Sequence, residues 1–223
     1  MIHIRAKKRE ETTQAILDEA ERLIEGAEPA ALTLLALTEA LGVTPAAIYR
    51  YYPSKEAIIV ALQRRTVAQL GEDVIAALNR IAGESPLVKI CAFVRTYATL
   101  PERRPTAFRL IALSLADPMT MLDDKTAGPV GADTAALLVA LNGLFADCAK
   151  YGYLAPPRGV PAAVLWGQIH GLLVVRKLGR LPGLEVLHEE ALVDEAVRTL
   201  LLGMGGDKAQ INRAIARVKK VFP

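Results

Sequence analysis

The sequence has few of the residues that build catalytic and metal sites. Its 223 residues include three histidines, His3, His170 and His188, which stand far apart without the close spacing of zinc ligands. It contains neither a phosphate-binding glycine loop nor a glycine-x-serine-x-glycine elbow. We therefore predict that the chain is not an enzyme and holds no metal and no cofactor.

Cysteine and aromatic residues are scarce as well. Both cysteines, Cys91 and Cys148, lie in apolar helical patterns, which predicts two buried free thiols in a reducing compartment. Aromatic residues make up 5% of the chain, and this low content argues against a broad aromatic cage for a ligand. The net charge of +3 is too small to indicate nucleic-acid binding by itself. Whether the chain can bind nucleic acid therefore depends on where its basic residues lie.

Long apolar runs are also missing from the sequence. A membrane-spanning helix needs about 20 mostly apolar residues, and the best candidate, residues 162–175, is shorter and contains Gln168 and His170. The N-terminus carries early charges and no apolar run of signal-peptide length. We expect a cytoplasmic protein without a membrane partner.

Alanine and leucine dominate a composition that is 52% hydrophobic, and their spacing predicts an all-α fold. Residues 1–10 are predicted to be a basic arm, either a DNA contact or a solvated terminus, and residues 117–133, rich in proline and glycine, to be a loop. Apolar residues at steps of three and four predict helices over residues 12 or 13 to 25, 34–41, 45–52, 54–80, 86–100, 106–116, 134–151, 162–179, 185–202 and 207–221.

The most informative stretch is residues 33–56, where two short helices are predicted. Thr33 is placed to cap the first helix, and Gly42 ends it, because glycine enters the left-handed conformation of a tight stop without steric cost. Thr44 then caps a second helix with Pro45 at its first position, Pro53 stops that helix, and Ser54 caps a third one. Two short helices joined in this way form a helix-turn-helix, whose second helix enters the DNA major groove.

The residue types on the second helix are suited to contact DNA. Small side chains at its start allow a close approach to the bases, whereas Ile48 is expected to point into the core. The predicted contact residues are Thr33, Thr44, Pro45, Ala46, Ala47, Tyr49, Arg50, Tyr51, Tyr52 and Lys55. We expect Thr44, Ala46, Ala47 and Tyr49 nearest the bases, and Thr33, Tyr52 and Lys55 on the phosphate backbone. The alternative is an ordinary helical hairpin with aromatic packing.

A resemblance to a known family favours DNA binding. The run from Ile48 to Glu56, with Leu41-Gly42-Val43-Thr44 before it, closely resembles the DNA-binding domain of TetR-type repressors, and the resemblance covers residues 8–62. Leu35 and Ala36 depart from the polar pair usual at these positions, which puts phosphate contacts from the first helix in doubt. The resemblance implies a homodimer on a palindromic operator of double-stranded DNA, with a long helix linking the DNA-binding head to the body.

A second resemblance concerns residues 166–172, which are similar to the tryptophan-histidine-glycine (WHG) group of TetR-type C-terminal domains. In the family, the last two long helices pair with their copies in a second subunit, and Gly167 and Gly171, one turn apart, would let the backbones approach closely. The larger domain is implied to bind a small-molecule effector. The predicted effector pocket is lined by Phe93, Tyr97, Phe108, Leu141, Phe145, Trp166 and His170, which favours a largely hydrophobic effector. Alternatively, Trp166 and His170 pack and hydrogen-bond within the core.

These observations together predict a homodimeric transcriptional repressor released from its operator by the effector. The predicted divisions are residues 1–10 (arm), 11–56 (helix-turn-helix domain), 57–203 (effector-binding and dimerisation domain) and 204–223 (C-terminal amphipathic helix). That last helix has three interpretations: attachment to a membrane surface, an extra DNA contact, or docking on the body or the partner subunit. The alternative to a regulator is a helical ligand-binding or scaffold protein without DNA function.

Overall fold

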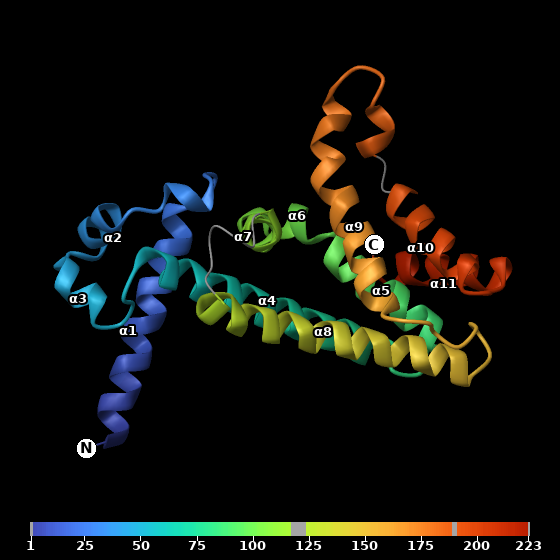
Figure 1. Ribbon diagram of the computed structural model, residues 1–223, viewed down its shortest axis with the longest axis horizontal. Helices are drawn as coiled ribbons and strands as arrows, with labels where there is room; N and C mark the ends of the chain where they lie inside the picture. The colour runs from blue at the N-terminus through green and yellow to red at the C-terminus, as the bar shows by residue number, and fades with distance from the viewer. Residues whose placement is uncertain (1, 117–123, 189–190, 223) are drawn as a thin grey trace. The chain divides into compact units, whose positions relative to one another are not determined.

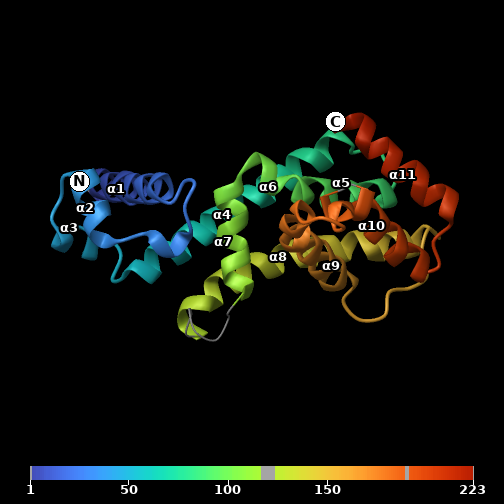
Figure 2. The ribbon, with the colours of Figure 1, turned by 90° about the horizontal axis from the view of Figure 1, so that it is seen from above.

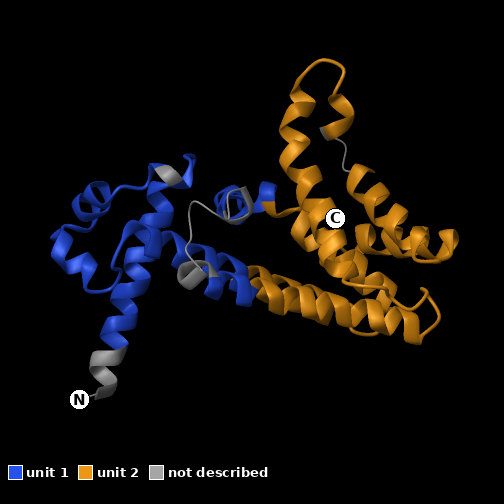
Figure 3. Cartoon of the chain, viewed as in Figure 1, with its two compact units in different colours: residues 1–68, 101–133 blue, residues 69–100, 134–223 orange. Residues whose placement is uncertain are grey.

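The computed structural model describes residues 2–116, 124–188 and 191–222, and these contain helices and no strand (Figure 1). The all-α prediction is therefore confirmed. The chain divides into two compact units, coloured separately in Figure 3: unit 1 comprises residues 1–68 and 101–133, and unit 2 comprises residues 69–100 and 134–223. This division differs from the predicted domain boundaries because residues 101–133 belong to the same unit as the helix-turn-helix.

Unit 1 is built around the two short helices of the helix-turn-helix. Its elements are α1 (Ile2–Leu23), η1 (Pro29–Ala31), α2 (Leu34–Leu41), α3 (Pro45–Tyr49), the first half of α4 (Lys55–Arg80), α6 (Leu100–Arg103) from Pro101 onward, α7 (Pro105–Ala116) and the start of α8 (Asp124–Lys150). Helices of eight and five residues, the lengths of α2 and α3, are too short to be stable alone in water. Packing against α1, α4 and α7 must hold them.

A single apolar core supplies that packing. It draws on α1, α2, the α3 segment, α4 and α7, and consists of Ile16, Leu17, Ala20, Ile24, Leu32, Leu37, Ile48, Tyr52, Ile58, Ile59, Leu62 and Leu110. The leucine and isoleucine stripes predicted for the first helices supply most of it. Gln63, buried beside this core, donates from Nε2 to the carbonyl of Leu110 over 3.2 Å and so joins α4 to α7.

Unit 2 contains the rest of α4 and α8 together with the C-terminal helices. Its further elements are α5 (Pro86–Ala98), α9 (Pro161–Val175), η2 (Arg176–Arg180), η3 (Glu185–His188), α10 (Ala191–Gly203) and α11 (Lys208–Val221). Helix α11 packs on α5 and α10 (Figure 2) with Ile211, Ala214, Ile215 and Val218 buried. Because its apolar side is covered by the chain itself, the C-terminal helix docks on the body. The membrane-surface interpretation is therefore wrong for α11.

The first helix begins earlier than predicted. The sequence predicted an arm up to residue 10 and a helix start at Thr12 or Thr13, but α1 runs from Ile2. Both threonines lie inside the helix, where their hydroxyls donate to the carbonyls of Lys8 and Arg9, over 2.8 and 2.9 Å. A hydroxyl that bonds four residues back is satisfied within the helix and does not act as a cap. The arm prediction is therefore corrected to a helical extension.

Helix α8 also begins earlier than predicted. Residues 124–133 are helical although they contain Gly128, Pro129 and Gly131, and the remainder of the predicted loop, residues 117–123, lies outside the described residues. Proline lacks the N–H that a helix interior needs, so the segment carries a local cost. Tertiary contacts offset it: Val130 is buried, and Arg64 of α4 binds Asp133 over 2.8 Å.

Smaller differences occur elsewhere. Helix α4 ends at Arg80 as predicted, while the short helix α6 forms between the helices predicted over residues 86–100 and 106–116. The helix predicted over residues 162–179 ends at Val175 and continues as η2, and the one predicted over 185–202 is η3 followed by α10, with residues 189 and 190 outside the described part.

One membrane expectation needs correction. Residues 128–150 of α8 are long and apolar enough to cross a membrane, with a mean hydropathy of 1.4, whereas the sequence analysis expected no segment to reach this length. This finding rests on the length and composition of the segment only. The apolar segment of α8 is mostly exposed, because only 17% of it is buried within the chain.

Candidate functional site

Local capping fixes the first helix of the candidate DNA-binding site. Thr33 precedes α2, and its hydroxyl accepts from the backbone N–H of Ala36 over 3.2 Å. Gly42 closes the helix with φ 63° and ψ 33°, in the left-handed region. Both predictions about the ends of this helix are confirmed, and the geometry gives α2 sharp limits on either side.

Helix α3 begins directly after this turn. Thr44 occupies the N-cap position in extended conformation, Pro45 is the first helical residue, and the Thr44 hydroxyl makes no capping hydrogen bond. Ile48 is 1% exposed and anchors the helix to the core of unit 1. On the other side of the helix, Pro45, Ala46 and Tyr49 are exposed to solvent.

The structure presents most of the predicted contact residues to solvent. Those that are exposed are Thr33, Thr44, Pro45, Ala46, Tyr49 and Arg50; those that are partly exposed are Ala47, Tyr51 and Lys55. Tyr49 is 49% exposed although it lies between the buried Ile48 and the core tyrosine Tyr52. An exposed aromatic side chain on a short helix of small residues is the most distinctive feature of this surface.

Tyr52 differs from the prediction. Its side chain is 8% exposed and belongs to the core of unit 1, so its main role is packing rather than a phosphate contact. Burial raises the pKa of the Tyr52 hydroxyl, and the positive charge of Arg65 offsets part of this rise. Among three tyrosines within four residues, the sequence alone did not show which ring faces the core.

The start of α4 is capped as predicted. The Ser54 hydroxyl accepts from the N–H of Ala57 over 3.2 Å. Hydrogen bonds from its own backbone and from Ser54 lower the pKa of Glu56, which keeps a negative charge in the first turn of α4, where the helix dipole favours it. This cap sets where α4 starts and hence where Lys55 lies relative to α3.

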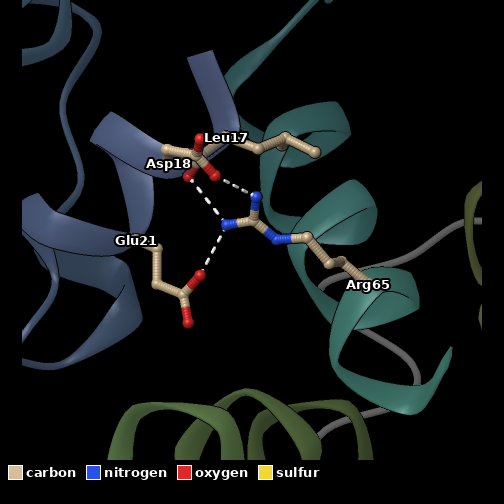
Figure 4. Close-up of polar contacts among 4 residues, drawn as sticks. All are labelled: Leu17, Asp18, Glu21 and Arg65. Atoms are coloured by element: carbon tan, nitrogen blue, oxygen red, sulfur yellow. Dashed lines mark hydrogen bonds and ion pairs between the residues drawn. The ribbon is translucent and has the colours of Figure 1, made fainter. Parts of the chain in front are cut away.

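An arginine that the sequence analysis did not single out joins α4 to α1 (Figure 4). The Arg65 guanidinium donates to Asp18 and to Glu21, each over 2.5 Å, and to the carbonyl of Leu17 over 3.2 Å. Its side chain is 17% exposed. We call these four residues the Arg65 clamp. Arg65 lies 44 residues or more from each of its three partners in the chain, so no local pattern could have indicated the clamp.

A second arginine contact involves Tyr51, one of the predicted DNA-contact residues. The guanidinium of Arg9, on α1, lies over the ring of Tyr51 at 5.4 Å from its centroid. Arg9 is exposed and Tyr51 is partly exposed. This contact connects the N-terminal part of α1 to the segment that follows α3.

In unit 2 the structure brings together three of the predicted effector residues. The Tyr97 hydroxyl lies 2.6 Å from Nδ1 of His170, and the Trp166 ring centroid is 6.1 Å from that of His170. Burial raises the pKa of Tyr97, which a hydrogen bond with Trp166 partly offsets, and burial lowers the pKa of His170. Both shifts favour the uncharged forms of the phenol and the imidazole, which a single hydrogen bond joins.

The other predicted effector residues are placed differently. Phe93, Leu141 and Phe145 are buried in unit 2, whereas Phe108 belongs to unit 1 and is partly exposed. Two clefts lie elsewhere. One of about 410 Å³ lies between α1 and the start of α7, the other of about 320 Å³ lies between α5 and α11, and no residue of the predicted effector set lines either.

Comparison with known proteins agrees with the geometry of the helix-turn-helix. Residues 16–62 match the family described as bacterial regulatory proteins, tetR family. An uncharacterised HTH-type transcriptional regulator of Mycobacterium tuberculosis (strain H37Rv) is 32% identical over 92 residues, which are 40% of this chain and 46% of that protein. The match therefore spans less than half the length of that relative.

Solved structures share the fold over most of the chain. A TetR-family transcriptional regulator from Agrobacterium tumefaciens superposes with a TM-score of 0.65 and 18% identity, over 88% of this chain and 98% of that one. A transcriptional regulator from Saccharomonospora viridis, in complex with choline, gives a TM-score of 0.67 and 19% identity, over 86% and 94%. At such identities these structures show a common fold alone. Residues 16–62 are thus a tetR-family DNA-binding region by their match, and the chain as a whole shares the fold of the solved regulator structures.

Proposed function

We propose that the chain is a DNA-binding transcriptional regulator, acting as a repressor on double-stranded DNA. The observation that carries this proposal is the exposed surface of α3, where Tyr49 and Arg50 are solvent-accessible while Ile48 holds the helix to the core. A short helix fixed in this way presents its N-terminal residues to base edges in the major groove. A scaffold protein would have no need of an exposed tyrosine and arginine on a helix of small residues.

The residues divide into two roles by their chemistry. Thr44, Ala46 and Tyr49 lie on the exposed side of α3 and are assigned to base edges. Thr33 at the start of α2 and Lys55 at the start of α4 are assigned to phosphates, which an N–H group, a hydroxyl or an ammonium can bind. Tyr52 is left out of the contact set because its ring is in the core.

The regulator is proposed to act as a homodimer through α8 and α9, whereas the sequence analysis placed the interface on the last two long helices. Val139 of α8 is 70% exposed and Val164 of α9 is 58% exposed, and a helix as apolar as α8 needs a cover. Gly167 and Gly171 are exposed on α9, and a Cβ atom added to either would meet nothing within 4 Å. Their small size serves no contact within this chain, which supports a close approach by a second copy.

Two-fold symmetry of the dimer makes a palindromic operator the expected target. Selection of duplexes from a random pool with the purified chain tests this directly. Enrichment of an inverted repeat, lost when Arg50→Ala is used instead, supports the regulator. Recovery of random sequences with both proteins would support the scaffold alternative. Tyr151→Ala serves as a matched control, because Tyr151 is an exposed tyrosine of unit 2.

The dimer is tested by sedimentation. Val139→Glu and Val164→Glu place a charge in the proposed interface and should yield monomers, whereas Leu35→Glu, at a residue of α2 that is 67% exposed, should remain dimeric. Wild-type chain that is monomeric at micromolar concentration would contradict the proposal. Co-flotation of the wild type with lipid vesicles would show that a membrane covers α8 instead.

The effector is proposed to bind in unit 2 around Tyr97, Trp166 and His170. Their hydrogen-bonded group lies among buried apolar residues, which favours a largely hydrophobic effector with one polar group placed against the imidazole. The effector must prefer the conformation that does not fit the operator, typically by about 1–3 kcal/mol. Compounds that release the selected DNA identify it, and His170→Phe should weaken its effect without weakening DNA binding.

A further inference from the structure

The N-terminal part of α1 carries a basic edge that the proposed contact set does not include. Residues 2–11 contain four basic residues and two acidic ones. Lys7, Lys8 and Arg9 are exposed, and Lys7 reaches Glu11 only at 4.0 Å, with both side chains mostly in solvent. Such an exposed pair contributes little, so the edge keeps its positive character.

Arg9 joins this edge to the helix-turn-helix. Its guanidinium lies over the face of the Tyr51 ring, 5.4 Å from the centroid. A cation–π contact with the face of a ring uses none of the N–H groups of the guanidinium, and these donors match the two oxygens of a phosphate. The Tyr51 ring therefore holds Arg9 in place without forming a hydrogen bond to any of its N–H groups.

We infer that Arg9, held on Tyr51, binds a DNA phosphate beside the half-site that α3 reads. The inference rests on the proposed DNA-binding function and deepens it by extending the contact surface to a second element. The helical backbone of residues 2–11 is essential to it, because a rigid helix holds Arg9 in place where a flexible arm would not. The positive charge of Arg9, its N–H donors and its contact with Tyr51, two residues after α3, all fit a contact with the phosphate backbone.

The test compares affinities of variants for the selected operator over a salt series. A dimer on two half-sites loses two phosphate contacts with Arg9→Ala, so the slope of log K against log salt should fall by about 1.8. Binding should weaken about tenfold at 0.15 M salt. Tyr51→Leu should produce much of the same loss, Tyr51→Phe almost none, and Arg9→Ala combined with Tyr51→Leu little more than Arg9→Ala alone.

Lys220→Ala is the matched control, since it removes an exposed positive charge from α11 in unit 2. It should leave both the affinity and the slope unchanged. The inference is overturned if the wild type binds its operator and Arg9→Ala behaves like Lys220→Ala. Absence of sequence-specific binding by the wild type would overturn the proposed function, and this inference with it. Thermal unfolding of each variant shows that the exposed substitutions leave the fold intact.

Discussion

Replacing Arg65 by methionine removes the charge of the Arg65 clamp and keeps a side chain of similar length. Three acceptors lose their donor: the carboxylates of Asp18 and Glu21 and the carbonyl of Leu17. Hydrogen bonds to charged groups contribute about 1.5–3 kcal/mol each when desolvated, and exposed ion pairs about 0–1 kcal/mol. The clamp lies between these limits, because the Arg65 side chain is 17% exposed while those of Asp18 and Glu21 are 70% and 39% exposed.

Between these limits, we expect Arg65→Met to lower the free energy of unfolding of unit 1 by about 2 kcal/mol. The two carboxylates return to water in the variant, so no buried unpaired charge adds to this value. Because Glu21 is less exposed than Asp18, Glu21→Gln should lower the free energy of unfolding more than Asp18→Asn does. For a unit of about 100 residues, 2 kcal/mol corresponds to a fall in Tm of about 10 °C.

Urea unfolding followed by circular dichroism measures these differences, with Arg64→Met as the matched control. Arg64 is the neighbouring arginine of α4. Its side chain is 51% exposed, against 17% for Arg65, and it pairs with the single carboxylate of Asp133, so its loss should cost less. At 1 M salt the gap between wild type and Arg65→Met should narrow because exposed charges are screened. Equal midpoints for wild type and Arg65→Met, or a larger cost for Asp18→Asn than for Glu21→Gln, would refute the reasoning from burial.

Three further predictions concern stability and reactivity. Gly42→Ala should lower the free energy of unfolding, measured in urea, by about 1–2 kcal/mol. The cost comes from the left-handed backbone alone, because an added Cβ meets nothing within 4 Å. Gly42→Asn should cost less, and equal costs for the two variants would contradict this. Burial raises the pKa of Cys91 and Cys148 to about 12, so a disulfide reagent at pH 8 should modify the native chain far more slowly than the unfolded one. Burial lowers the pKa of His170, so the unfolded state binds the proton more readily and stability should fall as pH drops from 6.5 through the folded pKa. His170→Gln should reduce this fall between pH 7.5 and 5, and an unchanged pH dependence would contradict it.

Local chemistry made the helix-turn-helix predictable from the sequence. Thr33, Gly42 and Ser54 act through bonds or torsions within a few residues, and the structure shows each of them in the predicted position. Such signals depend on nothing distant. The same local reasoning failed at Thr12 and Thr13, because a threonine near a helix start bonds backward as readily as it caps.

What the sequence did not reveal depends on tertiary contact. Pro129 sits inside α8, in a segment where a buried valine and an ion pair with α4 offset its local cost. Tyr49 and Tyr52 are the same residue type on one short segment, and only the packing of α3 decides that one is exposed and the other in the core. Arg9 and Arg65 gain their partners from distant parts of the chain.

The central claim, that α3 reads DNA sequence, is tested most directly by one ratio. The dissociation constant of the selected operator is compared with that of a scrambled duplex at 0.15 M salt, for the wild type and for Tyr49→Ala. We predict a ratio of about 10³ or more for the wild type, falling steeply in Tyr49→Ala while scrambled DNA is bound equally by both. Equal affinity for operator and scrambled DNA in the wild type, or no effect of Tyr49→Ala on the ratio, would contradict the account.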